Sequence, residues 1–168
     1  MRYAMSGNWW PERLTISDAG TPRFEVRNSP GFATMLSLSV ADGDEIAAVR
    51  RRRGGRFQVI VRGKEAGLVR RRADRYDIQN TLWSLAAAGS VTDGQYSITR
   101  DGLALATVSR QITDDVRPMQ TITVDIGDGD AVTLLATVLA VEAVRYEHGG
   151  SHFNPRALLD LLNPFNWW

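Results

Sequence analysis

An arginine-rich stretch is the part of this sequence whose residue types point most clearly to a chemistry. Between Arg50 and Arg75 the chain holds eleven basic and two acidic residues, a net charge of +9, whereas the remainder holds nine basic and seventeen acidic residues, a net charge of −8. Guanidinium groups bind phosphate and carboxylate oxygens, so this contrast indicates a surface for polyanions on an acidic body. The candidate anion-binding residues are Arg50, Arg51, Arg52, Arg53, Arg56, Arg70, Arg71 and Arg72.

Three consecutive strands are needed to bring these arginines together. Segments 45–53, 56–62 and 65–72 have the alternating pattern of strands, with glycine turns at Gly54-Gly55 and Gly63. In such a meander the arginines collect at the Gly54-Gly55 end, where close cations repel one another unless acids or an anionic partner neutralise them. Two interpretations remain open: an anion-binding surface, or a solvated rim paired with acids. The acids considered for that pairing are Asp42, Asp44, Asp114 and Asp115.

Short alternating segments bounded by glycine turns recur through the first three quarters of the chain and predict an antiparallel β-meander. Hairpins such as 56–63 and 95–102 resemble copies of one unit, with apolar residues at every second position before a turn glycine. One hairpin cannot bury its apolar face alone, so we expect a closed antiparallel barrel of about twelve strands. Further strands are expected near 13–17, 23–27, 35–40, 75–80, 95–100, 103–110 and 120–125, with weaker candidates at 3–6 and 82–91.

The segment 130–147 interrupts the strand pattern, because residues 131–141 are apolar on almost every face of a helix. Such a helix must be surrounded by protein. Eleven residues span about 16 Å at the standard rise, well short of the roughly 30 Å of a bilayer core. We therefore expect a core helix that is capped by Asp130 or Asp128, with Arg145 near its negative end.

The order of motifs in the last third of the chain is similar to that of a known family. Residues 96–110, then 120–125, then the step from Asp130 into the apolar helix follow its pattern, and residues 1–20 match its start. Over about residues 1–148 the chain resembles the LURF-one-related family, of the tubby-like and phospholipid scramblase-like superfamily. The resemblance implies a twelve-stranded barrel threaded by a C-terminal helix. The family supplies no catalytic residues. Tubby proteins, which share this fold, bind phosphoinositides.

The remaining twenty residues, 149–168, form a separate tail in this interpretation, so that the barrel domain spans 1–148 and Gly149-Gly150 is the hinge. Residues 154–168 have the composition of a short amphipathic helix with an aromatic tip. Either the tail docks into a partner or membrane boundary, or it folds back over the barrel. The candidate docking residues are Leu158, Leu159, Leu161, Leu162, Phe165, Trp167 and Trp168.

Several chemistries lack support in the sequence. The chain has no cysteine, which excludes disulfides and thiolate metal sites. Asp125, Asp128 and Asp130 lack the distal glutamate of an EF-hand, and His148 and His152 have no fixed geometry. No triad or nucleotide-binding glycine loop is recognisable. We therefore expect no catalytic residue, no metal and no cofactor.

These observations favour a non-enzymatic binding module for anionic surfaces, most of all membrane phospholipid headgroups, which bind at the arginine-rich end of the barrel. The alternative is a protein-interaction adaptor that docks through its Leu/Trp tail. The first eleven residues contain no apolar run typical of a signal peptide, so we expect a cytoplasmic protein, peripheral at the inner membrane face. Neither a transmembrane span nor sequence-specific nucleic-acid binding is expected.

Overall fold

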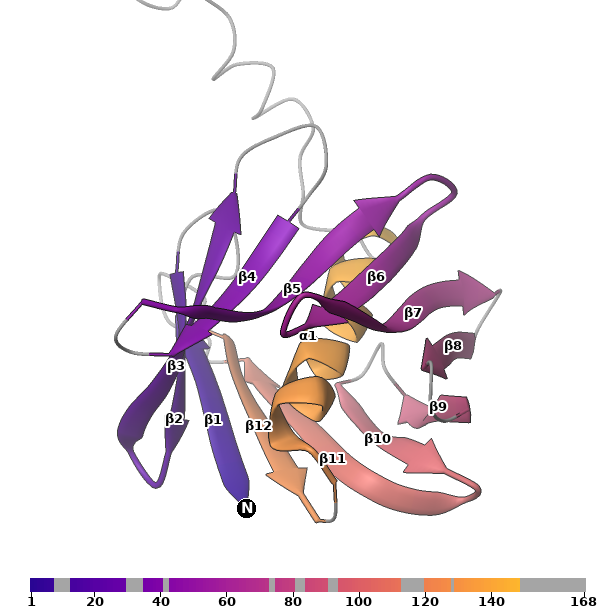
Figure 1. Ribbon diagram of the computed structural model, residues 1–168. Coiled ribbons are helices and arrows are strands. Elements are labelled where there is room, and N and C mark those ends of the chain that lie inside the picture. Colours follow the sequence, from indigo (N-terminus) through magenta and orange to yellow (C-terminus); the bar gives the residue numbers. More distant parts are fainter. Residues whose placement is uncertain are drawn as a thin grey trace, which may run out of the picture.

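The computed structural model describes residues 1–7, 13–29, 35–40, 43–72, 75–80, 84–90, 94–112, 120–127 and 129–148. The predicted mainly β fold with a C-terminal helix is confirmed in this part of the chain (Figure 1). The elements are β1 (Arg2–Gly7), β2 (Arg13–Asp18), β3 (Thr21–Ser29), β4 (Met35–Val40), β5 (Glu45–Arg52), β6 (Arg56–Val61), β7 (Lys64–Arg72), β8 (Arg75–Asn80), β9 (Ser84–Ser90), β10 (Gln95–Arg100), β11 (Leu103–Ile112), β12 (Gln120–Ile126) and α1 (Ala131–His148).

The strands form one antiparallel sheet in which each strand pairs with its neighbours in sequence. β1 pairs with both β2 and β12, so the strand order closes on itself as a barrel. The β8–β9 pairing is short, with three register pairs against six between β1 and β12. Pairing on both sides gives each described strand hydrogen-bonding partners at both edges, which protects the sheet from pairing with other chains.

One end of the barrel is built from tight turns that repeat the same geometry. In the turns Ala19-Gly20, Arg62-Gly63 and Asp101-Gly102 both residues have positive φ, from 47° to 81°. This is the type I′ pattern, which matches the twist of the paired strands. Each of the three hairpins also has a register shift two to three residues before its turn. The similarity of these hairpins in sequence therefore corresponds to a shared turn and a shared bulge.

The opposite end, here called the arginine end, is where β5 and β7 stop, β6 and β8 begin and α1 finishes (Figure 1). The Gly54-Gly55 turn lies there, and Arg52 is directly opposite Arg56 across it. Arg72 is opposite Arg75 at the next pair of strand ends. The antiparallel order thus carries the arginine-rich segments of three strands to the same end, as the turn positions predict.

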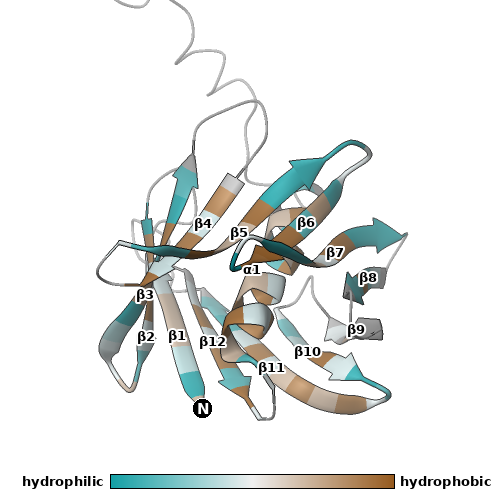
Figure 2. Cartoon of the chain, viewed as in Figure 1, coloured by the Kyte–Doolittle hydropathy of each residue, from teal (hydrophilic) through white to brown (hydrophobic). Residues whose placement is uncertain are grey.

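Helix α1 runs through the barrel and is part of the hydrophobic core (Figure 1). It lies closest to β5, β6 and β7. Apolar residues alternate along the strands and occur around much of the helix (Figure 2). The predicted core helix is confirmed, because its apolar residues are at most 1% exposed on several faces. These residues include Leu134, Leu135, Ala136, Val138, Leu139, Ala140, Val141 and Val144.

The start of the helix is fixed by an N-cap. The Oδ2 atom of Asp130 accepts hydrogen bonds from the backbone N–H of Thr133 at 3.3 Å and from the Thr133 hydroxyl at 2.5 Å. This satisfies one of the backbone donors that the first turn leaves unpaired. Asp130 is thus the predicted cap, whereas Asp128 lies outside the described residues.

Membrane crossing by a helix requires both length and apolar character. No helix in the described part of the chain combines the two to the extent that a span requires. The expectation of a core helix is consistent with this finding.

The burial of α1 predicts that Leu135→Asp prevents cooperative folding. Leu135 is fully buried, and a carboxylate at that depth has no partner to offset its loss of hydration. Leu103→Asp is the matched control, because Leu103 is 70% exposed, and it should melt like the parent. Thermal unfolding followed by circular dichroism measures both. A cooperatively melting Leu135→Asp protein would show that the helix is not the core.

Candidate anion-binding surface

Strand alternation divides the candidate arginines between two faces of the barrel. Arg51 of β5 is directly opposite Phe57, and Arg71 of β7 is directly opposite Tyr76. Both aromatic residues are buried in the core, so these two arginines occupy inward register positions. Their strand neighbours therefore face outward. The outward set comprises Arg50, Arg52, Arg56, Arg70 and Arg72.

A row of like charges crosses the outer face at the arginine end. Arg56 is opposite Arg52 on one side and Arg70 on the other, an arrangement that is unfavourable unless the charges are satisfied. The Gln58 side-chain amide accepts hydrogen bonds from one of these arginines. Arg52 donates to its oxygen through Nε at 2.8 Å and through Nη2 at 2.5 Å. The Gln58 amide nitrogen in turn donates to Glu65 at 2.5 Å. Because Gln58 is neutral, Arg52 is hydrogen-bonded without a carboxylate in direct contact.

Two carboxylates pair directly with other candidate arginines, on the outer and the inner side. Asp77 of β8 contacts Arg70 at 3.3 Å and Arg72 at 3.0 Å, and Glu147 in the last turn of α1 forms an ion pair with Arg51. Neither acid was among those considered from the sequence. Of the four that were, Asp42, Asp114 and Asp115 lie outside the described residues, and Asp44 forms no ion pair with a described residue.

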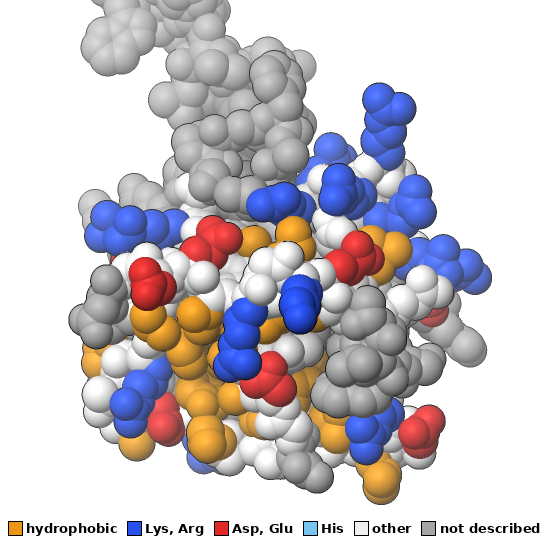
Figure 3. Space-filling model, viewed as in Figure 1, with side chains coloured by type: hydrophobic (Ala, Val, Ile, Leu, Met, Phe, Trp, Pro, Cys, Tyr) orange, Lys and Arg blue, Asp and Glu red, His pale blue; other side chains and the backbone are white. Residues whose placement is uncertain are grey.

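Among the candidate arginines, Arg50, Arg53 and Arg56 are exposed and have neither an acidic partner nor the amide contact of Arg52 in the described part of the chain. The Arg56 Nε donates to the backbone carbonyl of Arg53 at 3.1 Å, which holds the Arg56 side chain against the Gly54-Gly55 turn. With Arg52 they form what we call the anion surface. Figure 3 shows Lys and Arg side chains gathered at this end of the molecule, over the ends of β5, β6 and β7.

A buried charged cluster lies inside the barrel below the arginine end. Glu142 of α1 is 0% exposed and accepts hydrogen bonds from the Tyr96 hydroxyl at 3.0 Å and from Arg110 Nη2 at 3.3 Å. Its second oxygen lies 2.8 Å from Arg145 Nε and 3.2 Å from Arg110 Nη2. One carboxylate is thus shared by two guanidinium groups with side chains only 4% and 16% exposed.

The off-centre position of the helix explains the long side chains of this cluster. Because α1 lies against β5–β7, Tyr96 on β10 and Arg110 on β11 must extend inward to reach Glu142. Gly94 makes room for that extension: a Cβ there would lie 2.7 Å from the Cβ of Arg110, and the Gly94 φ is +80°. The Arg110 N–H also donates to the Gly94 carbonyl at 2.8 Å.

Burial also sets the protonation of the two tyrosines near this cluster. Burial, with the adjacent Glu142 carboxylate, raises the pKa of Tyr96 well above its usual value of about 10. Burial raises the pKa of Tyr76 as well. Tyr96 therefore stays protonated at neutral pH and acts as a hydrogen-bond donor. Glu142 has no solvent access, and its contacts with Tyr96 and Arg110 join α1 to β10 and β11.

The sequence analysis did not identify this cluster. Its signal is a single acidic residue, Glu142, at the end of an otherwise apolar helical segment and three positions before Arg145. That spacing places the two side chains on one helix face. Nothing in the sequence marks the other two partners, which lie 46 and 32 residues away along the chain.

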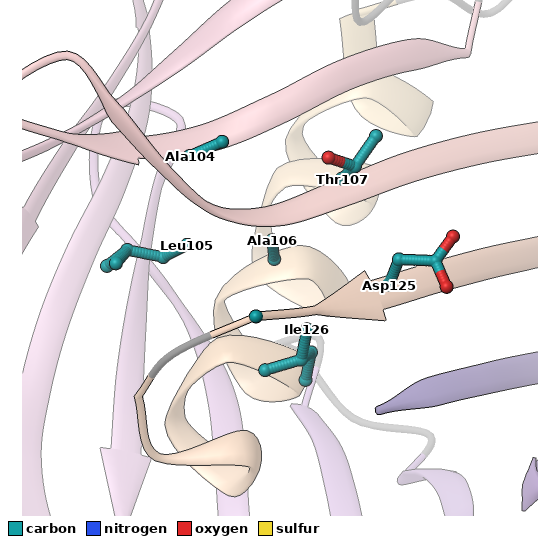
Figure 4. Close-up of a pocket in the computed structure, with 7 residues that line it drawn as sticks. Ala104, Leu105, Ala106, Thr107, Asp125 and Ile126 are labelled. Carbon is teal, nitrogen blue, oxygen red and sulfur yellow. The ribbon is translucent and has the colours of Figure 1, made fainter.

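A separate open hollow of about 240 Å³ lies in the barrel wall at the end opposite the arginines (Figure 4). Ala104 to Thr107 of β11 line it, together with residues from Asp125 to Gly127. The Asp125 carboxylate is engaged by Arg2 at 2.7 and 3.1 Å, which lowers the pKa of Asp125. Apart from Asp125 and Thr107, the lining consists of small or apolar residues.

Metal ligation finds no geometric support in the part of the chain that the structure describes. No three His, Cys, Asp or Glu side chains there are placed to hold an ion. Asp125 pairs with Arg2, and Asp130 caps the helix.

The predicted docking residues of the tail, all within 149–168, lie outside the described residues, as do Asp128 and His152. The chain matches no family model and no curated protein.

The cluster geometry predicts that Glu142→Gln strongly destabilises the protein. Removing the carboxylate charge leaves two nearly buried guanidinium groups without a counter-ion, which costs roughly 3 to 5 kcal/mol. Glu147→Gln, which alters a partly exposed ion pair between the same helix and β5, should cost at most about 1 kcal/mol. Guanidinium chloride unfolding compares the two proteins. Equal unfolding midpoints would contradict a stabilising role for the buried cluster.

Proposed function

We propose that this protein is a non-enzymatic binding module that associates with anionic surfaces, above all with phospholipid headgroups at the cytoplasmic face of a membrane. The observation that carries the proposal is the anion surface itself. Arg53 and Arg56 at the Gly54-Gly55 turn, and Arg50 two register pairs along β5, are exposed and without an acidic partner among the described residues. Their neighbours Arg52 and Arg70 extend the positive row along the strand ends.

The rigidity of the site supports this proposal. The register of β5, β6 and β7 holds the cations close together before any ligand binds, so little further ordering is needed on association. Repulsion within the row is relieved when phosphates approach it. Arginine suits such a partner because its planar group donates two parallel hydrogen bonds to a phosphate.

We further propose that the protein belongs with the LURF-one-related, tubby-like proteins that its sequence resembles. Antiparallel strands around a C-terminal helix are the arrangement that the resemblance implies, which supports the assignment. Lipid binding by tubby proteins favours a membrane ligand by analogy, whereas the proposal itself rests on the arginines of the site. The buried position of Glu142 and Tyr96 favours binding over catalysis.

The proposal predicts that Arg50→Gln, Arg53→Gln and Arg56→Gln together weaken binding to phosphatidylglycerol vesicles by about a hundredfold. Each basic residue at an anionic membrane contributes about 1 kcal/mol, so three contribute about 3 kcal/mol. The parent should bind these vesicles with an affinity that falls as salt is added. It should not bind vesicles of phosphatidylcholine alone. Vesicle co-sedimentation measures both.

A matched control separates a local site from net charge. Arg23, Arg62 and Lys64 are exposed and lie at the opposite end of the barrel. Their triple glutamine variant loses the same three charges but should bind nearly as well as the parent. If both triple variants lose binding equally, the anion surface is not the site. If the parent does not bind at all, the adaptor function replaces this proposal. If the parent binds oligonucleotides strongly, nucleic acid replaces phospholipid as the proposed ligand.

A further inference from the structure

We propose that Arg51 is a second anion-binding point, on the inner side of the arginine end, and that Glu147 occupies it as an internal competitor for the external anion. This inference rests on the proposed function and concerns its regulation. The ligand is the same phosphate headgroup that binds the anion surface. In the unbound protein, the Glu147 carboxylate occupies the position on Arg51 that a phosphate oxygen of the headgroup would take.

The first support is the position of Arg51. It lies between Arg50 and Arg52 on β5, but strand alternation turns it to the inner side, opposite Phe57. It pairs there with Glu147 in the last turn of α1. The Arg51 side chain is 45% exposed and that of Glu147 is 26% exposed, so water and a headgroup both have access to the pair.

The second support is that the helix end is an unfavourable place for a carboxylate. Partial negative charge accumulates at a helix C-terminus, and an acidic side chain in the last turn is destabilised by it. Glu147 is the second-last residue of α1, so its pairing with Arg51 offsets that repulsion. When a phosphate takes its place, the Glu147 carboxylate returns to water at little cost, because it is already partly exposed.

The third support is the contrast with Glu142, about one turn earlier in the same helix. Glu142 is fully buried, and its two arginine partners are nearly so. Release of that carboxylate would leave buried charges unpaired, which is very costly. Of these two helix carboxylates, the outer one is therefore suited to exchange and the inner one to holding the helix in place.

The proposal predicts that Glu147→Gln increases affinity for phosphatidylglycerol vesicles about fivefold, because it releases one arginine to the membrane. Asp125→Asn is the matched control: it removes the same charge from an exposed ion pair, that with Arg2, at the other end of the barrel. The control should leave vesicle affinity near that of the parent. Co-sedimentation at fixed ionic strength compares the three proteins.

The Arg51→Gln background separates release of Arg51 from a general loss of negative charge. Arg51→Gln alone should change affinity little, since Glu147 already occupies that arginine, and adding Glu147→Gln to it should bring no gain. A full gain in the Arg51→Gln background, or no gain in the parent background, would overturn the inference. Both outcomes leave the proposed function standing if the parent binds vesicles and the anion-surface variant does not.

Discussion

The apolar character of α1 is the constraint on which the rest of the structure depends. A helix with no polar face is unstable in water unless protein covers it on every side, and a sheet that closes around it supplies that cover. Closure also fixes the register of the strands, and register decides which side chains point inward. The same constraint therefore places the core, the buried Glu142 cluster and the outward arginines.

A second consequence of closure is that one basic run serves two different environments. The four consecutive arginines Arg50 to Arg53 are alike in sequence, yet alternation sends Arg51 toward the helix end and its neighbours toward solvent. The arginines have different partners on the two sides: outside, Arg52 donates to the Gln58 amide, and inside, Arg51 pairs with the Glu147 carboxylate of the helix. Arg50, Arg52 and Arg56 remain able to bind a partner because no described carboxylate contacts them directly, unlike Arg70 and Arg72, which pair with Asp77.

The sequence was sufficient for the features that depend on local pattern. Alternation and turn glycines predicted the hairpins, uninterrupted apolar residues predicted the core helix, and the Gly54-Gly55 turn predicted that the arginines would gather at one end. The acidic partners could not be predicted in this way. Asp77 and Glu147 meet their arginines only through strand register and the helix position, and Tyr96 reaches Glu142 across 46 residues of sequence.

The close passage of Arg110 over Gly94 has a consequence for how this protein can diverge. Any side chain at position 94 would displace Arg110, which would leave Glu142 with less compensation in the core. A change at one of these three positions is then tolerated only together with changes at the others. We therefore expect homologous chains to retain the glycine, the arginine and the glutamate together, or to replace all three together by an apolar set.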